Sequence, residues 1–370
     1  MKSIQIWIAI ITLVTMKSMA QVMPLTLEPD GGNLKASVSE QIGIAKITIN
    51  YSRPGVKGRE GKIWNTGVAH YGFKDLGHGT STAAPWRAGA NENTTFSFSH
   101  PVKIEGKDLP AGEYGFFIAL GETESILIFS KISTSWGSFY YDSTQDALRV
   151  TVNNQSSEKS VEWLTYEFTN ETKTSATVAM SWEKRIIPFK IEADIQHIQI
   201  ESFKKELRTT RSYFDFVNAV NYCIENNIEL EQALAWIDRA IYFRVMGVKN
   251  FLTLSTKAAL LTKMNRLEDA AKIMQEAIPF GTEPEVHQYG KSLLAQKQNQ
   301  EAFKIFKFNY DKKPTSFITN VGMARAYSAL GEYKKAQQYL NIALPVAPDE
   351  ANRNIVKSMI EKLKDGKNIN

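Results

Sequence analysis

The stretch LGEYKKAQQYLNIALPVAP, Leu330 to Pro348, has the apolar spacing of a short α-helix. Ala336, Leu340 and Ala343 stand at positions 0, +4 and +7, which lie on one face of a helix. Pro348 follows twelve residues after Ala336 and ends the helix, because proline has no N–H with which to continue it. The stretch therefore predicts one amphipathic helix between two turns.

Three earlier stretches repeat this unit. They are NNIELEQALAWIDRAI (226–241), MNRLEDAAKIMQEAI (264–278) and QNQEAFKIFKFNY (298–310). The alanines that anchor the four copies are Ala233, Ala270, Ala302 and Ala336, which lie 37, 32 and 34 residues apart. A period near 34 with small residues where helices cross is typical of stacked helix–turn–helix repeats.

The last copy resembles the tetratricopeptide repeat. The positions that match its pattern are Ala324, Tyr327, Gly331, Ala336, Ala343 and Pro348. The resemblance extends over about residues 214–348, but Asn309 replaces a small residue in the third copy. The first two copies lack the glycine and the terminal proline. The resemblance implies an α-helical solenoid, and we expect it to bind a protein or peptide partner.

Before the repeats the apolar residues alternate at period two, from about Ile42 to Ile191, which predicts half-buried strands. Val178, Met180 and Trp182 predict one strand, and the run from Phe189 to Ile191 predicts the next. We expect eight or nine short strands in all. Such a set predicts an antiparallel β-sandwich or a barrel-like domain.

The chain is thus predicted to be multidomain, β then α. The predicted parts are a signal peptide (1–20), an all-β domain (21–192), a linker and first helix (193–212), about four helical repeats (213–350), and a cap helix with a tail (351–370).

The β half carries five ordered motifs: ITINYSRPGVKGR, WRAGANENTTFSFS, VKIEGKDLPAGEYGFF, SWGSFYYDSTQDALRV and VAMSWEKRIIPF. Together they resemble the bacterial domain-of-unknown-function family numbered 2911, over about residues 34–191. The resemblance implies no established activity. It also implies a short link before PWRAGAN, where this chain has the longer stretch NTGVAHYGFKDLGHGTSTAA (65–84).

Two interpretations of the polar turn before Thr94 stay open. Arg87 is either a fork for a carboxylate or phosphate, with Glu92 as a base or ligand, or an internal partner in a structural turn. In the structural interpretation Trp86 packs in the core, Gly89 takes a backbone conformation closed to other residues, and Glu92 pairs with Arg53, Arg59 or Arg149. The ligand-binding candidates are Arg53, Arg59, Trp86, Arg87, Asn91, Glu92, Trp136 and Arg149.

The histidines of residues 65–84 give at most a weak metal candidate. His70 and His78 are eight residues apart, which matches no established metal motif. The sequence contains no phosphate loop, no dinucleotide fingerprint and no G-x-S-x-G motif. We expect no cofactor and name no catalytic residue.

In the repeats, the inward face of the first helix of each pair is expected to line a concave groove. Counting back from the anchor alanines gives the partner-groove candidates Asn218, Tyr222, Lys263, His287, Lys291 and Arg325. The alternative is an ordinary polar surface.

The N-terminus has the pattern of an export signal. Lys2 precedes an apolar run from Ile4 to Met16, and small residues stand before Gln21, so we expect cleavage after Ala20. An uncleaved N-terminal anchor is the alternative. After cleavage we expect no transmembrane span. A single cysteine forms no internal disulfide, which fits an exported protein of the bacterial periplasm.

The net charge of +5 includes no dense block of lysine and arginine, and we expect no nucleic acid partner. Two functions remain. The first is an exported, non-catalytic binding or scaffolding protein, whose repeats bind a protein partner and whose β-domain binds a small polar ligand or a second partner. The second is a periplasmic hydrolase with a pocket near Arg87 and Glu92, or a metal site at the loop of His70 and His78.

Overall fold

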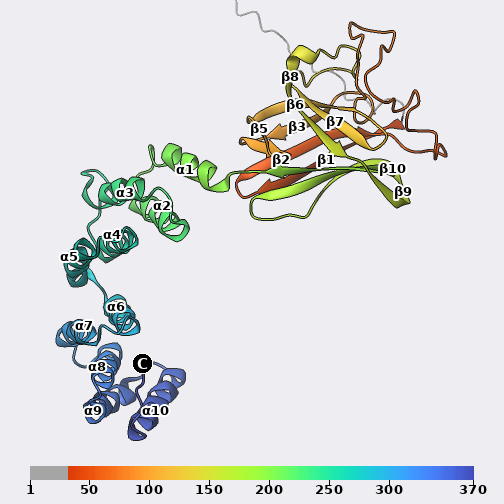
Figure 1. The fold of residues 1–370 in the computed structure, drawn as a ribbon. Helices are drawn as coiled ribbons and strands as arrows, with labels where there is room; N and C mark the ends of the chain where they lie inside the picture. Colours follow the sequence, from red (N-terminus) through yellow and green to blue (C-terminus); the bar gives the residue numbers. More distant parts are fainter. Residues whose placement is uncertain (1–31) are drawn as a thin grey trace, which may run out of the picture. The chain divides into compact units, whose positions relative to one another are not determined.

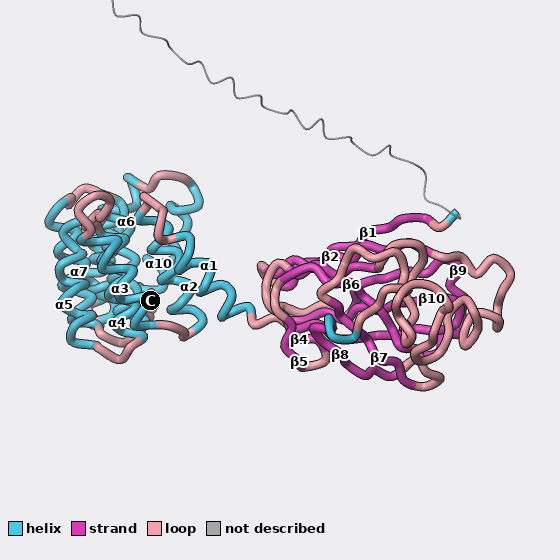
Figure 2. The backbone as a smooth tube through the Cα atoms, turned by 90° about the horizontal axis from the view of Figure 1, so that it is seen from above, coloured by secondary structure: helices cyan, strands magenta, loops and turns pink. Residues whose placement is uncertain are grey.

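The computed structural model of the chain describes residues 32–370 (Figures 1 and 2). The predicted signal peptide and its cleavage site after Ala20 lie outside the described residues. The chain divides into two compact units between Ile200 and Glu201. Within residues 32–370, no helix combines the length and the apolarity that a membrane crossing needs.

The first unit consists of two antiparallel sheets (Figure 1). Its strands are β1 (Leu34–Ile42), β2 (Ala45–Arg53), β3 (Thr94–Phe98), β4 (Val102–Ile104), β5 (Lys107–Leu109), β6 (Gly112–Ala119), β7 (Glu124–Ser130), β8 (Asp146–Asn153), β9 (Gln155–Thr169) and β10 (Ser175–Glu192). One sheet has the order β1-β2-β3-β6-β7-β8 and the other the order β5-β4-β10-β9. Neither sheet closes on itself, so of the two predicted architectures the sandwich forms and the barrel does not.

A cluster of aromatic side chains joins the two sheets. The ring of Phe96 in β3 lies 4.6 Å from that of Phe116 in β6 and 5.8 Å from that of Phe189 in β10, between centroids. Phe189 belongs to the second sheet, so these contacts hold the layers together. All three rings are buried, and burial of each contributes about 1.5–3 kcal/mol to stability.

The two strands predicted around Trp182 and Ile191 are one long strand, so that prediction is wrong. β10 runs without a break from Ser175 to Glu192, but its register shifts on both sides of Glu183, where φ is 51°. Before the bulge the buried side chains stand at even positions, and after it they stand at odd positions. An apolar pattern that changes parity in this way predicts two strands, although the backbone continues as one. The carboxylate of Glu183 accepts a hydrogen bond from Trp64 Nε1 at 2.9 Å.

The long segment between β2 and β3 is tied to the unit by short backbone bridges. These pair Trp64 with Ala69, Tyr71 with Leu120, Lys74 with Ala84, and Trp86 with Ile118. Residues 65–84 are thus held in a fixed conformation beside the end of β6 by backbone hydrogen bonds.

The second unit consists of stacked helices (Figure 1). The helices of the described chain are α1 (Ile195–Glu206), α2 (Tyr213–Asn226), α3 (Leu230–Tyr242), α4 (Phe251–Lys263), α5 (Leu267–Ala277), α6 (Glu283–Ala295), α7 (Asn299–Lys312), α8 (Phe317–Ala329), α9 (Tyr333–Ala343) and α10 (Glu350–Lys364). The predicted repeats correspond to the pairs α2–α3, α4–α5, α6–α7 and α8–α9. All four anchor alanines are buried. Cys223 in α2 is also buried, and burial raises the pKa of its thiol to about 11.

Phe306 of α7 is the central side chain of the third repeat. It is 1% exposed. A Cβ added to Gly290 would stand 2.7 Å from the Phe306 ring, and one added to Gly322 would stand 2.6 Å from it. Both positions must therefore remain glycine for α6 and α8 to approach the ring at this distance.

Asn309, the exception to the small-residue pattern, is buried in the same repeat. Its Nδ2 donates a hydrogen bond to the carbonyl oxygen of Glu283 at 2.9 Å. The amide therefore ties α7 to the beginning of α6, and this bond provides the partner that a buried polar group requires.

The residues that follow α10 turn back onto α8. Ser328 Oγ donates to Asn368 Oδ1 at 2.9 Å and accepts from the backbone N–H of Ile369 at 3.1 Å. Arg325 Nη1 donates to the carbonyl oxygen of Ile369 at 3.3 Å, and Asn370 Nδ2 donates to that of Arg325 at 3.0 Å. Ile369 is buried. We call the last three residues the returning tail.

Candidate functional site

The segment that begins at Trp86 is a tight turn anchored in the core. Trp86 is buried. Ala88 and Asn91 adopt positive φ values of 51° and 55°. We expected that conformation at Gly89, which instead provides space, because a Cβ there would stand 2.8 Å from Thr94 Oγ1.

Arg87 is a half-buried cation for which the described residues offer no carboxylate partner. Its Nη1 donates to the carbonyl oxygen of Asn91 at 3.2 Å. The guanidinium carbon lies 5.1 Å from the centroid of the Phe139 ring and rests on Gly137, where a Cβ would stand 2.6 Å from it. Burial lowers the pKa of Arg87, although the group stays charged in proteins.

Glu92 pairs with a residue from the edge strand β1. Lys35 Nζ lies 2.8 Å from Glu92 Oε1, and Ser52 Oγ donates to Oε2 at 3.4 Å. The hydrogen bond from Lys35 lowers the pKa of the Glu92 carboxyl. Glu92 also forms a backbone bridge with Trp136, whose side chain is 47% exposed. Arg87 and Glu92 therefore do not neutralise each other.

Arg53 and Arg59 bind backbone and hydroxyl oxygens. Arg53 donates through Nε to the Leu164 carbonyl at 2.8 Å and through Nη2 to Thr165 Oγ1 at 2.7 Å, which joins β2 to β9. Arg59 donates to two carbonyl oxygens of its own loop, at 2.7 and 3.0 Å. Neither forms the expected pair with Glu92.

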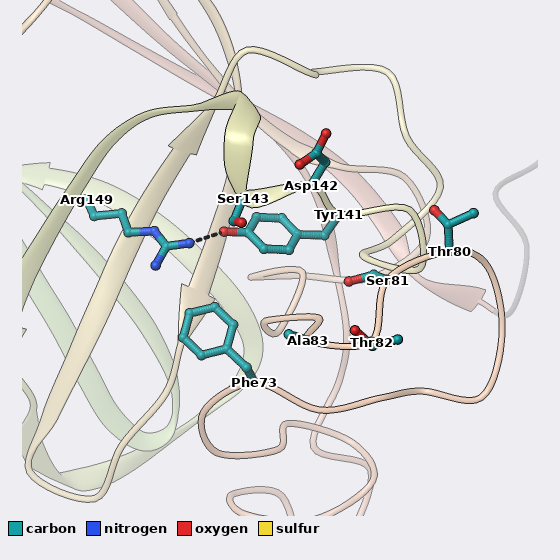
Figure 3. A pocket seen from close by; sticks show the side chains of 9 residues that line it. All are labelled: Phe73, Thr80, Ser81, Thr82, Ala83, Tyr141, Asp142, Ser143 and Arg149. Carbon is teal, nitrogen blue, oxygen red and sulfur yellow. Dashed lines mark hydrogen bonds between the residues drawn. The ribbon is translucent and has the colours of Figure 1, made fainter.

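Arg149 lies in a cavity of about 540 Å³, the Arg149 pocket (Figure 3). The pocket is lined by Phe73, Thr80, Ser81, Thr82, Ala83, Tyr141, Asp142, Ser143 and Arg149. Arg149 Nε donates to Asp146 Oδ2 at 2.5 Å and Nη2 donates to the hydroxyl oxygen of Tyr141 at 2.6 Å. Burial and the Asp146 carboxylate raise the pKa of Tyr141, so this phenol is neutral. The expected pair with Glu92 is again absent.

The two histidines of residues 65–84 have different surroundings. His70 is buried, its Nδ1 has no hydrogen-bond partner, and burial lowers its pKa. His78 is exposed, with its ring 6.2 Å from that of Phe139. Across residues 32–370 no group of three or more histidine, cysteine, aspartate or glutamate residues is arranged to hold a metal ion.

The repeat unit contains a second cavity, of about 680 Å³, which we call the α4–α6 groove. Its lining residues come from α4, α5 and α6 and from two positions after α6: Phe251, Ser255, Ala258, Ala259, Thr262, Leu267, Ala270, Ala271, Met274, Glu285, Gln288, Tyr289, Ser292, Leu293, Gln296 and Gln298. Ala259 and Ala271 are exposed, and Leu267 is 59% exposed. The groove therefore presents apolar side chains to solvent between the second and third repeats.

The structure brings three of the predicted partner-groove residues together. His287 of α6 is affected by the charges of Lys291 and Arg325, and with Arg325 it lines a smaller cavity of about 340 Å³. Asn218 and Lys263 are exposed on α2 and α4. Tyr222 is half-buried, with its ring 5.4 Å from that of Phe203.

Two family models match the chain, one in each unit. Residues 34–191 match DUF2911. That family is described as a protein of unknown function. Residues 293–359 match the tetratricopeptide repeat. The comparison with curated proteins gives no match.

Two solved structures are similar to part of the chain. One is titled "Crystal structure of YrrB: a TPR protein with an unusual peptide-binding site"; it is 15% identical, the match covers 44% of this chain and 91% of that one, and the TM-score is 0.28. The other is titled "MamA MSR-1 C2", with 10% identity, 42% and 95% coverage, and a TM-score of 0.26.

Within the DUF2911 region, the candidate residues do not share one site. Arg87, Asn91, Glu92 and Trp136 cluster at one turn, whereas Arg149 lies in its own pocket. The sequence reasoning missed the hydroxyl residues from Thr80 onward that line this pocket. Their signal was the GTSTAA end of the longer stretch, where small polar residues stand together. It also missed the alanines of the α4–α6 groove, because alanine in a helix pattern ordinarily predicts a buried crossing point.

Proposed function

We propose that this chain is a non-catalytic binding protein whose tetratricopeptide repeats hold an apolar, uncharged peptide segment of a protein partner in the α4–α6 groove. The chemistry of the groove is the observation that carries the proposal. Its apolar lining includes the exposed side chains of Ala259, Leu267 and Ala271. A groove that exposes such residues between two helical repeats fits an apolar chain segment.

The rim of the groove favours peptide backbone over charged side chains. Gln288, Gln296 and Gln298 line it together with the hydroxyls of Ser255 and other residues. Amide side chains donate and accept hydrogen bonds, as a peptide backbone requires. Glu285 is the charged residue of the lining, and its Oε2 accepts from the backbone N–H of Thr282 at 2.8 Å.

Two of the partner-groove candidates identified from the sequence, Lys263 and Lys291, belong to the same proposal as flanking contacts. Lys263 ends α4, and Lys291 lies on α6 near the groove residues Gln288 and Ser292. Exposed charges of this kind mainly steer association and add little to affinity. We therefore expect them to change the association rate more than the dissociation rate.

A random-peptide phage library selected on the full chain tests this proposal. We expect the enriched peptides to be apolar and poor in charge, and we expect Ala259→Arg with Ala271→Arg to weaken their binding about hundredfold, since two charges would be buried in the contact. Ala295→Arg is the matched control, because Ala295 is an exposed helix alanine outside the groove. Equal loss in the control, or enrichment of highly charged peptides, contradicts the proposal.

We also propose that the first unit binds a small polar ligand in the Arg149 pocket. The support is the size of the cavity, which lies in the range of about 300–1,000 Å³ usual for small-molecule sites. The hydrolase alternative lacks support of this kind, because Arg87 and Glu92 have separate partners. An acid–base site needs such groups to converge.

Finally, we propose export to the periplasm, supported by the basic start, the apolar run and the small residues before Gln21. Protein recovered from the periplasmic fraction of expressing cells is expected to begin at Gln21 on N-terminal sequencing. Ala20→Leu should block this cleavage, because the peptidase requires a small residue there. A chain that begins at Met1 in the membrane fraction supports the uncleaved anchor instead.

A further inference from the structure

The Arg149 pocket is lined by several hydroxyl groups that form no hydrogen bond within the described part of the protein. Thr80, Ser81, Thr82 and Ser143 all line it, and none of their hydroxyls has a hydrogen-bond partner among the described residues. Figure 3 shows the side chains of Ser81 and Thr82 beside the cavity, across from Tyr141. Hydroxyls both donate and accept, so the lining suits a ligand with many groups of the same kind.

Arg149 is held so that part of its guanidinium remains free for a ligand. Its Nε and Nη2 are engaged by Asp146 and Tyr141, whereas Nη1 has no partner in the described part of the chain. The guanidinium carbon also lies 5.3 Å from the centroid of the Phe73 ring. Three contacts fix the group before a ligand arrives, which lowers the entropy cost of binding.

The charged residues in and beside the pocket disfavour an anionic ligand. Among its lining residues Arg149 is the cation and Asp142 is an anion. Arg149 is further neutralised by Asp146, whose side chain is nine-tenths buried beside it. A phosphate or carboxylate would meet a cation that already has its carboxylate partner, with a second carboxylate at the rim.

The pocket also offers apolar surface between its polar groups. The Phe73 side chain is 37% exposed, and its ring lies 6.4 Å from that of Tyr141, between centroids. Ala83 adds a methyl group. A pyranose has the matching character, because it presents hydroxyls around its edge and C–H groups on its faces.

We propose that the Arg149 pocket binds a neutral saccharide of one or two rings. The hydroxyls of Thr82, Ser81 and Ser143 exchange hydrogen bonds with those of the sugar, Arg149 Nη1 donates to a ring or hydroxyl oxygen, and Asp142 accepts from a hydroxyl. The inference rests on the proposed ligand-binding role of the first unit and names the class of its ligand.

Isothermal titration calorimetry of the full chain tests the inference with named probes. The neutral probes are glucose, galactose, N-acetylglucosamine, maltose and cellobiose, each at up to about 10 mM, the range of weak small-ligand binding. The anionic probes are inorganic phosphate, glucuronate and glucose 6-phosphate. We expect at least one neutral probe to bind and its anionic counterpart to bind more weakly.

Paired variants then locate the binding. Thr82→Val with Ser143→Ala should weaken the sugar about tenfold, because each removes a hydrogen bond to the ligand and none within the protein. Thr123→Val is the matched control, because Thr123 is an exposed threonine of the β6–β7 turn outside the pocket.

The possible failures have different meanings. Binding of the anionic probes alone, with the same loss in the paired variant, overturns the saccharide and leaves the ligand pocket standing. Binding of no probe, or sugar binding that the paired variant leaves unchanged, overturns both the saccharide and the proposed role of this pocket.

Discussion

Replacement of Phe306 by alanine is expected to lower the free energy of unfolding of the repeat unit by about 3–5 kcal/mol, the usual cost of removing a buried phenylalanine. Phe306 is 1% exposed, and α6 and α8 approach it through Gly290 and Gly322. Without the ring, both glycines face a cavity that a rigid pair of helices closes poorly. Urea unfolding of the full chain, followed by the helical circular dichroism signal, measures the loss.

Two further variants separate this explanation from a general effect of losing a phenylalanine. Phe280→Ala is the matched control, because Phe280 is 51% exposed, and we expect it to cost less than about 1 kcal/mol. Gly322→Ala alone is expected to destabilise by about 1–3 kcal/mol through overpacking. In the Phe306→Ala background the same change should cost less, because the ring that the new methyl group would strike is gone. Additive costs contradict this account of the packing.

Lowering the pH from 7 to 4 is expected to remove about 2–3 kcal/mol of stability through His287 alone. Burial lowers the pKa of His287 to about 4, and the positive charges of Arg325 and Lys291 act in the same direction. The unfolded chain has a histidine pKa of about 6.5. Between these two values the unfolded state binds the proton and the folded state does not, so stability is complete above about pH 6.5 and falls towards pH 4.

Unfolding free energies measured across this pH range test the prediction. His287→Gln keeps a polar side chain of similar size but does not titrate, so its stability should depend less on pH over this interval. His197→Gln, at an exposed position of α1, should leave the pH dependence as it is. If the His287 and His197 variants behave alike, the acid sensitivity has another source.

The repeats were predictable from the sequence because their contacts are local. Each repeat is defined by residues within one helix pair: the anchor alanine, its apolar neighbours and the closing proline. The spacing of Ala336, Leu340 and Ala343 therefore predicts the buried face that the helix has in the structure. The role of Asn309 was not predictable, since its partner is a backbone carbonyl of the preceding helix.

The β-domain was predictable as a sandwich but not in its details. The bulge at Glu183 inverts the alternation within a single strand, and a sequence pattern has no way to mark that as continuous. The partner of Glu92 is Lys35, 57 residues earlier on the neighbouring edge strand. Arg53, Arg59 and Arg149 were the expected partners of Glu92 because they lie in the sequence motifs. Contact between residues far apart in the sequence depends instead on the order of the strands in the sheet.

The returning tail covers part of α8 and so distinguishes the last helices of the stack from the earlier ones. Asn368 and Asn370 bond to α8 through Ser328 and Arg325, in the way that an extended ligand would, and Ile369 fills an apolar seat there. That part of α8 is therefore occupied from within the molecule, while the α4–α6 groove is open. A partner segment that reaches this part of α8 would therefore have to displace residues 368–370 and their hydrogen bonds to Ser328 and Arg325.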